Sequence, residues 1–381
     1  MAYESVDKLQ KTLAENVFHY AKDAKKASGR ALGTLVEIIT FYMLKSWGFE
    51  QSTAIERPIA EYGNVEITHN VEYSLHPVLR ETKTEFLDPK MPLSATRIFA
   101  LLQDSSFDVA SFEKTGTLLI TQGDVLRNSC VVAKGPYSHL TATLINKKKT
   151  DFLVSIAELH TKPYAMFECK RVGIEEGMSK GPQTIEKAKQ GAYVARAVSS
   201  LQKIRTAKGT LQGIIYRPDG TVYTKPFNDL IAEIIQSNDS GLLQDFILTV
   251  GIVSNHGNWF TSDNHNKELK VLAQSYDWLI FLTDEGLAEF IHQLLLEPTE
   301  LLQPAKKAFL ASYKVDKKGN QFTKVQMQYD ADQVLQDYFR NNATRIENWF
   351  NVIQPKTGSV SLLKQQLSTL RQKDWKRVHE L

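Results

Sequence analysis

Cysteine is scarce in this chain, whose 381 residues contain two, Cys130 and Cys169. Neither lies in a CxxC pair or at a Cys/His spacing that binds zinc, which excludes a disulfide framework and a structural zinc site. Long apolar runs are absent as well, and the N-terminus lacks the charged-then-apolar pattern of a signal segment. We therefore expect a cytoplasmic protein without a membrane span.

A strong excess of charge of one sign is also missing. The chain has 46 basic and 43 acidic residues, so its formal net charge is +3. Such a small value does not by itself indicate a nucleic-acid partner, and any basic surface must come from local clustering. No P-loop is present, which argues against an ATP-driven motor and against a nucleotide cofactor.

Strand and helix patterns alternate along most of the chain. Two helices are expected over 4–48, short strands over 50–149, and alternating strands and helices from about 151 onward. This order predicts an α/β fold in which helices flank a mixed central β-sheet, with helical extensions at both ends. We expect a core over 1–296 and a mostly helical, polar extension over 297–381.

The segment "TDFLVSIAELHTKPYAMFECKRVG" (150–173) places charges at the ends of two apolar strands. If these strands form a hairpin turning at "LHTK", Asp151 lies opposite Lys170 and diagonal to Glu168. Two carboxylates so close repel each other unless a cation lies between them, and oxygen ligands suit Mg²⁺. The lysine ammonium can stabilise a developing anion. The three groups together are what phosphodiester hydrolysis needs.

A plainer interpretation of this segment is a surface hairpin with an incidental salt bridge. Acid-x-Lys triplets occur seven times in the chain, and most must lie on solvated faces. The triplet at Glu168 differs because it ends an apolar strand that follows another apolar strand opening with an acid. The nearest rival, Glu81-x-Lys83, follows "VEYSLHPVLR", in which His76 and Pro77 interrupt the strand pattern.

The acid followed by Glu-x-Lys resembles the core of the PD-(D/E)xK nucleases, and most of all type II restriction endonucleases. The resemblance implies that Asp151, Glu168 and the backbone carbonyl of Cys169 hold Mg²⁺ while Lys170 assists the attacking water. Thr150 stands where the family often has proline. Since most such enzymes cut palindromic sites in double-stranded DNA, the resemblance also implies a homodimer, with 297–381 available for dimerisation or DNA clamping.

Two further residues match roles in this family. Glu37 lies on an apolar helix before the core, where the family often has a glutamate that completes the metal site; the alternative is pairing with Arg30, Lys45 or a distant lysine. Gln190 follows the apolar stripe of the helix after the hairpin, where some members use a glutamine in QxxxY. Here the segment reads "QGAY", which is one residue shorter.

Basic and amide-rich segments predict the DNA contacts. Three lysines precede Asp151, further basic residues follow Lys170, and the loop "SNHGNWFTSDNHNKE" (254–268) combines asparagine, histidine and tryptophan after an apolar strand. Lysine and arginine would contact phosphates, and asparagine can read adenine edges. The alternative for each is a solvated side chain or a polar loop. The predicted DNA-binding residues are Lys147, Lys148, Lys149, Arg171, Lys180, Asn255, His256 and Asn258.

Other functions fit the sequence less well. "GMSKG" (177–181) matches the G-x-S-x-G of esterases but does not directly follow a strand, and no oxyanion loop precedes it. The His/Asn-rich loop lacks the spacing of an HNH nuclease. A structure-specific repair or recombination nuclease and a DNA-binding protein that has lost catalysis remain open. Retention of Asp151, Glu168 and Lys170 counts against the latter.

Overall fold

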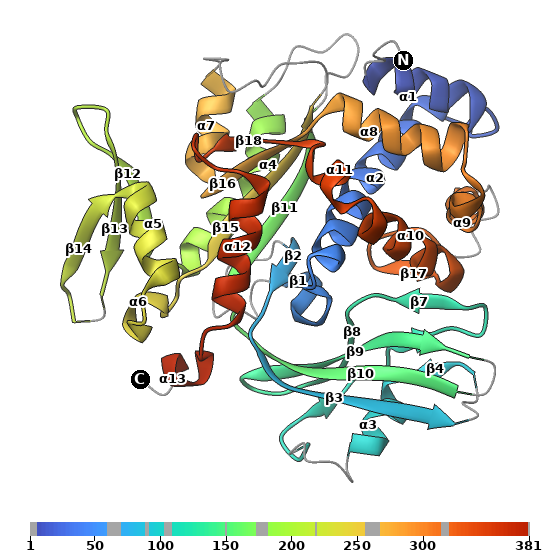
Figure 1. Cartoon of the computed structure of the whole chain (residues 1–381), viewed down its shortest axis with the longest axis horizontal. Coiled ribbons are helices and arrows are strands. Elements are labelled where there is room, and N and C mark those ends of the chain that lie inside the picture. Colours follow the sequence, from blue (N-terminus) through green and yellow to red (C-terminus); the bar gives the residue numbers. More distant parts are fainter. Residues whose placement is uncertain are drawn as a thin grey trace. The chain divides into compact units, whose positions relative to one another are not determined.

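A computed structural model describes residues 6–58, 70–87, 91–102, 109–148, 151–172, 182–217, 219–255, 267–313 and 320–379. The chain is a mixed α/β protein, as the sequence predicts (Figure 1). It forms two compact units. Unit 1 comprises residues 1–55, 78–161 and 283–349, and unit 2 comprises 56–77, 162–282 and 350–381. Each unit is therefore built from three separate segments of the chain.

Unit 1 contains a five-stranded antiparallel sheet in the order β3-β10-β9-β8-β5. One face of its long strands buries alternating apolar side chains such as Phe152, Val154 and Ile156, as the two-residue period of a strand requires. Helix α3 (Ala95–Leu102) adds Ile98 and Phe99 to this core. The strands are β3 (Val78–Leu87), β5 (Glu113–Lys114), β8 (Cys130–Lys134), β9 (Ser138–Lys147) and β10 (Asp151–His160).

Helices and a small four-stranded sheet, β17-β7-β6-β4, complete unit 1. The 23-residue helix α2 (Ala24–Ser46) is buried along most of its length, and Lys45 near its end makes a 2.9 Å ion pair with Asp332, whose carboxylate also accepts a 2.7 Å hydrogen bond from Tyr42. The other elements of the unit are α1 (Val6–Asn16), η1 (Glu50–Ser52), β4 (Leu93–Ser94), β6 (Leu118–Ile120), β7 (Val125–Arg127), α8 (Asp284–Ile291), η3 (His292–Leu296), η4 (Glu300–Leu302), α9 (Gln303–Ser312), β17 (Gln326–Gln328), α10 (Tyr329–Asn341) and α11 (Ala343–Glu347).

Unit 2 is organised around a six-stranded mixed sheet in the order β1-β2-β11-β15-β16-β18, with β1 entering it from unit 1. Strand β11 pairs antiparallel with β2 and parallel with β15, and β15 pairs parallel with β16. Helix α4 (Pro182–Val198) begins the long crossover between β11 and β15 and packs on both strands. The strands are β1 (Thr53–Pro58), β2 (Asn70–Leu75), β11 (Ala165–Val172), β15 (Leu248–Asn255), β16 (Trp278–Leu282) and β18 (Phe350–Gln354).

A three-stranded antiparallel sheet, β12-β13-β14, also belongs to this crossover. Helix α5 (Phe227–Gln236) packs on one of its faces, where Gly213 leaves room for Leu230 and Phe227. The remaining elements of unit 2 are β12 (Leu201–Arg205), β13 (Leu211–Tyr216), β14 (Val222–Pro226), α6 (Ser240–Leu243), α7 (Lys267–Ser275), α12 (Val360–Arg371) and α13 (Trp375–His379).

One sequence prediction about the fold is wrong. Strand β10 pairs with β3 and β9 along its two edges, and β11 pairs with β2 and β15, so the predicted hairpin between β10 and β11 does not form. The short link 161–164 instead leads the chain from one sheet to another. Within 297–381, β17 joins a sheet of unit 1 and β18 joins the main sheet of unit 2.

Within the described residues, the helices are either too short or too polar to cross a membrane.

Candidate active site

Strand β11 presents its two charged residues on one face of the sheet. Since side chains alternate along a strand, Glu168 and Lys170 share a face and Cys169 points to the other. The Lys170 ammonium lies 2.7 Å from Glu168 Oε1. The Glu168 side chain is only 1% exposed, whereas that of Lys170 is 27% exposed. A buried carboxylate is thus paired with a lysine that reaches the surface.

Strand β2 places a second carboxylate beside this pair. The register Ala165–Leu75, Met166–Ser74 and Phe167–Tyr73 ends one residue before Glu168, and Glu72 is the next residue of β2; its negative charge acts on Lys170. The Glu168 Oε2 accepts a hydrogen bond of 3.5 Å from the Glu72 N–H, although 96 residues separate the two in the sequence. Directly opposite residues of an antiparallel pair lie on the same face. Glu72, Glu168 and Lys170 therefore converge on one side of the sheet.

Helix α4 covers Glu168, and Gly191 makes that close approach possible. A Cβ at Gly191 would lie 2.7 Å from the Cβ of Glu168, which is closer than real side chains come, and 3.0 Å from its Oε2. One turn further along, Val194 and Ala195 pack with Met166 of β11 in a small apolar cluster. The helix and strand thus fix the Glu168 side chain between them. The sequence "QGAY" contains the glycine, but we predicted a role only for its neighbour Gln190.

Tyr276 borders Glu168 from the side of β15. Gly251 pairs with Glu168 in the β11–β15 register, and a Cβ there would lie 2.7 Å from the ring of Tyr276. Tyr276 is 2% exposed. Its ring therefore fills the space that a side chain at Gly251 would take, and this contact also was not predicted from the sequence.

Burial and the charged groups of the site shift the pKa values of Lys170 and Tyr276. Burial lowers the pKa of Lys170, but the negative charges of Glu168 and Glu72 outweigh this and raise it above its ordinary value. Burial and then the charge of Glu168 raise the pKa of Tyr276 well above the ordinary tyrosine value. At neutral pH Lys170 is therefore a cation and Tyr276 a neutral hydroxyl.

Asp151 and Glu37 lie in unit 1 and have partners there. Asp151 begins β10, opposite Leu87 of β3, and its Oδ2 lies 3.5 Å from Lys148 Nζ. The strand pairing that would set Asp151 opposite Lys170 does not form, because β3 and β9 take both edges of β10. Glu37 lies 3.4 Å from the ammonium of Lys324, whose side chain is 5% exposed. This is the distant lysine that the sequence left open as an alternative.

The predicted DNA-binding residues are only partly described. Lys147 forms an ion pair of 2.5 Å with Asp124 and lies over the ring of Tyr329, and Lys148 is 65% exposed. Of Arg171 in β11 and Asn255 in β15 the structure describes the backbone alone, and the same holds for Gln190 in α4, which was predicted as a catalytic residue. The other predicted contacts lie outside the described residues: Lys149, Lys180, His256 and Asn258.

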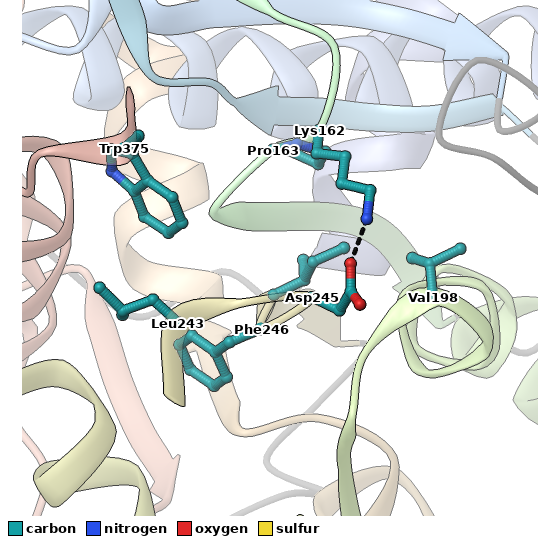
Figure 2. A pocket seen from close by; sticks show the side chains of 8 residues that line it. Lys162, Pro163, Val198, Leu243, Asp245, Phe246 and Trp375 are labelled. Atoms are coloured by element: carbon teal, nitrogen blue, oxygen red, sulfur yellow. Dashed lines mark hydrogen bonds and ion pairs between the residues drawn. The ribbon is translucent and has the colours of Figure 1, made fainter. Parts of the chain in front are cut away.

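A hollow elsewhere in unit 2 lacks comparable chemistry. Figure 2 shows the Lys162 ammonium pointing at the Asp245 carboxylate, with which it forms an ion pair, among apolar side chains that include Trp375 and Leu243. Lys162 and Asp245 are the two charged residues that line this hollow, and their opposite charges offset each other. Among the described residues, no group of three or more His, Cys, Asp or Glu side chains is arranged to hold a metal ion.

No protein-family model matches this chain, and comparison with curated proteins and with solved structures finds no significant similarity.

Proposed function

We propose that this protein is a metal-dependent nuclease that hydrolyses phosphodiester bonds in double-stranded DNA. The single observation that supports this most is the Glu168–Lys170 ion pair with Glu72 on the adjacent strand. It is an acid on one strand and Glu-x-Lys on the next, which is the arrangement of the PD-(D/E)xK nucleases. Glu72 takes the place in this proposal that the sequence had given to Asp151.

The donor set suits Mg²⁺. Magnesium in proteins binds one or two carboxylates and keeps several waters, so a cluster of three acidic side chains is not required. In this proposal the carboxylates of Glu72 and Glu168 and the backbone carbonyl of Cys169 would hold the ion. When bound, it would supply a water of lowered pKa and neutralise charge on a phosphoryl oxygen. A glutamate at position 72 departs from the aspartate of the family and reaches further by one methylene.

Lys170 contributes a fixed positive charge beside the reacting phosphate. Its raised pKa keeps it protonated at neutral pH, so it serves as a cation that orients water and stabilises a developing anion, and not as a base. Its partial exposure lets the ammonium reach a bound phosphate while Glu168 stays buried. Gly191 and Tyr276 act as positioning residues, since they pack against the carboxylate of Glu168 or beside it.

The finer form of the proposal is a type II restriction endonuclease that cuts a specific sequence as a homodimer. It rests on the resemblance of the Glu-x-Lys strand and on the symmetry of palindromic sites. Cleavage that depends on DNA structure and not on sequence would replace it with a repair or recombination nuclease. Binding without cleavage would replace it with a DNA-binding protein.

A plasmid digest tests the proposal directly. Purified protein is incubated with a plasmid of known sequence in Mg²⁺ or in EDTA, and Glu168→Gln purified in parallel controls for contaminating nucleases. We expect discrete fragments from the unsubstituted protein in Mg²⁺ and none in the other lanes. Equal cutting by Glu168→Gln, or no cutting of either modified or unmodified DNA, would contradict the proposal.

A further inference from the structure

Basic residues are concentrated in one part of unit 2. Between Glu186 and Asp219, residues 187–218 contain seven lysines and arginines and no acidic residue, in a chain whose net charge is +3. This stretch runs from α4 through β12 and β13. The seven residues are Lys187, Lys189, Arg196, Lys203, Arg205, Lys208 and Arg217.

The turn between β12 and β13 carries two of these charges at an exposed tip. We define the hairpin tip as residues 205–211. Strand β14 does not reach the tip, because its last pair with β13 at this end is Gln212–Pro226. Arg205 and Lys208 are both exposed. Figure 1 shows this tip projecting from unit 2 at the upper left. Beyond β14, the tip is a narrow two-stranded ribbon.

Hydrogen bonds within the tip hold it in one shape. The Thr206 N–H donates to Thr210 O at 2.9 Å, the Gly209 N–H donates to Thr206 O at 2.9 Å, and Gly209 has a positive φ of 79°. The Arg205 guanidinium donates to Gly209 O at 2.7 Å. A rigid tip loses little conformational freedom on binding.

A lysine joins the base of this hairpin to the neighbourhood of the candidate site. The ammonium of Lys203 donates hydrogen bonds to Tyr276 O at 2.7 Å and Ala273 O at 3.3 Å. The ring of Tyr276 packs against Gly251, the register partner of Glu168. The tip therefore begins two residues from a lysine anchored beside the site.

We propose that the hairpin tip is a second contact surface for duplex DNA, in which Arg205 and Lys208 bind backbone phosphates outside the cleavage site. This inference rests on the proposed function. The positive charge complements the phosphates, and a two-stranded ribbon has dimensions that a major groove admits. We choose DNA as the partner because a stretch with seven basic and no acidic residues, next to a proposed phosphodiesterase site, matches a long polyanion and not a small ligand.

Salt dependence of binding tests this surface. A labelled random-sequence duplex is titrated with full-length protein in Ca²⁺ at several salt concentrations, and anisotropy gives the slope of log affinity against log salt. Each phosphate contact adds about one to that slope, so Arg205→Ala/Lys208→Ala should reduce it by about two. Lys376→Ala/Arg377→Ala is the matched control, since it removes one exposed lysine and one exposed arginine from α13.

The outcomes separate the surface from the function. A reduced slope in the tip variant alone supports the inference, and Lys208→Ala alone, which leaves the Arg205–Gly209 bond intact, should reduce the slope by about one. Unchanged slopes, or equal reductions in tip and control variants, would overturn the inference while cleavage by the unsubstituted protein leaves the proposed function standing. Tighter, tip-dependent binding of a structured RNA would overturn the choice of DNA. If the unsubstituted protein neither binds nor cuts DNA, both the inference about the tip and the proposed function are contradicted.

Discussion

Glu72 and Asp151 are two acidic residues on strands that precede the Glu-x-Lys strand, yet their surroundings differ. Glu72 lies on β2, which pairs directly with β11, and its N–H contacts Glu168. Asp151 lies on β10, whose two edges are taken by β3 and β9, and its carboxylate forms a 3.5 Å ion pair with Lys148. Closeness in sequence to Glu168 favoured Asp151 as the second acid of the site, but the pairing of β2 with β11 favours Glu72.

The difference shows that a long segment inserted between two strands makes their pairing hard to predict from the sequence. Residues 78–161 belong to unit 1 and separate β2 from β11 along the chain. Consecutive strands usually pair, and the predicted hairpin relied on that tendency. Here the tendency fails at the point where the chain changes sheets.

The largest effect should come from Glu168→Gln. Loss of the buried carboxylate removes the central charge of the site, and we expect cleavage to fall by about a thousandfold, the upper end of the range for key electrostatic groups. DNA binding in Ca²⁺ should persist. Single-turnover kinetics and anisotropy measure the two quantities, and full cleavage by this variant would refute the site for Glu72 and Asp151 alike.

Metal affinity should separate the two acids. Glu72→Gln removes a proposed ligand, so we expect Mn²⁺ or Mg²⁺ binding to weaken by at least about tenfold, since even outer-shell changes cost that much. Asp151→Asn should leave the affinity unchanged. Calorimetric titration of both variants provides the comparison; the reverse pattern would return the metal site to Asp151.

The close packing of α4 on Glu168 predicts a smaller effect of Gly191→Ala. The added methyl would collide with the glutamate, so we expect a loss of roughly 1–3 kcal/mol in the free energy of unfolding and about tenfold slower cleavage. Gly33→Ala is the matched control, because its helical position has nothing within 4 Å and should be neutral or slightly stabilised. Equal behaviour of the two variants would show that α4 does not position Glu168.

Lys170 predicts a pH dependence of stability. The pKa of Lys170 is raised in the folded protein, so Lys170 contributes to the free energy of unfolding. This contribution is fully present below its unfolded-state pKa of about 10.4 and is lost as pH rises through its folded-state pKa. Denaturant unfolding of the unsubstituted protein and Lys170→Met should therefore converge only at strongly alkaline pH. A difference that disappears near neutral pH would show that Lys170 is not held by Glu168 and Glu72.

Glu37→Gln should have little effect on cleavage. Its ion pair with the buried Lys324 accounts for the glutamate, so we expect a loss of about 1–3 kcal/mol in stability and a cleavage rate within about twofold of the unsubstituted protein. The family role predicted from the sequence gives the opposite result. A higher Mg²⁺ requirement in this variant would restore Glu37 to the metal site.

Local patterns in the sequence predicted part of this site. The apolar strand ending in Glu168 and Lys170 was recognisable because it is continuous along the chain. Glu72 was visible within "NVEYSL", and the interruption at His76 and Pro77 marks the passage from β2 to β3. The pairing of β2 with β11 was not predictable, because contacts between strands 96 residues apart leave no local pattern. Gly191 and Tyr276 depend on the same long-range packing.

The central claim is that Glu72, and not Asp151, completes the site of Glu168 and Lys170. The most direct test is the single-turnover rate of DNA cleavage in Mg²⁺ for Glu72→Gln and Asp151→Asn, measured side by side with the unsubstituted protein. We predict a loss of about a hundredfold or more for Glu72→Gln and a rate within about twofold for Asp151→Asn. A severe loss for Asp151→Asn with normal cleavage by Glu72→Gln would contradict the claim.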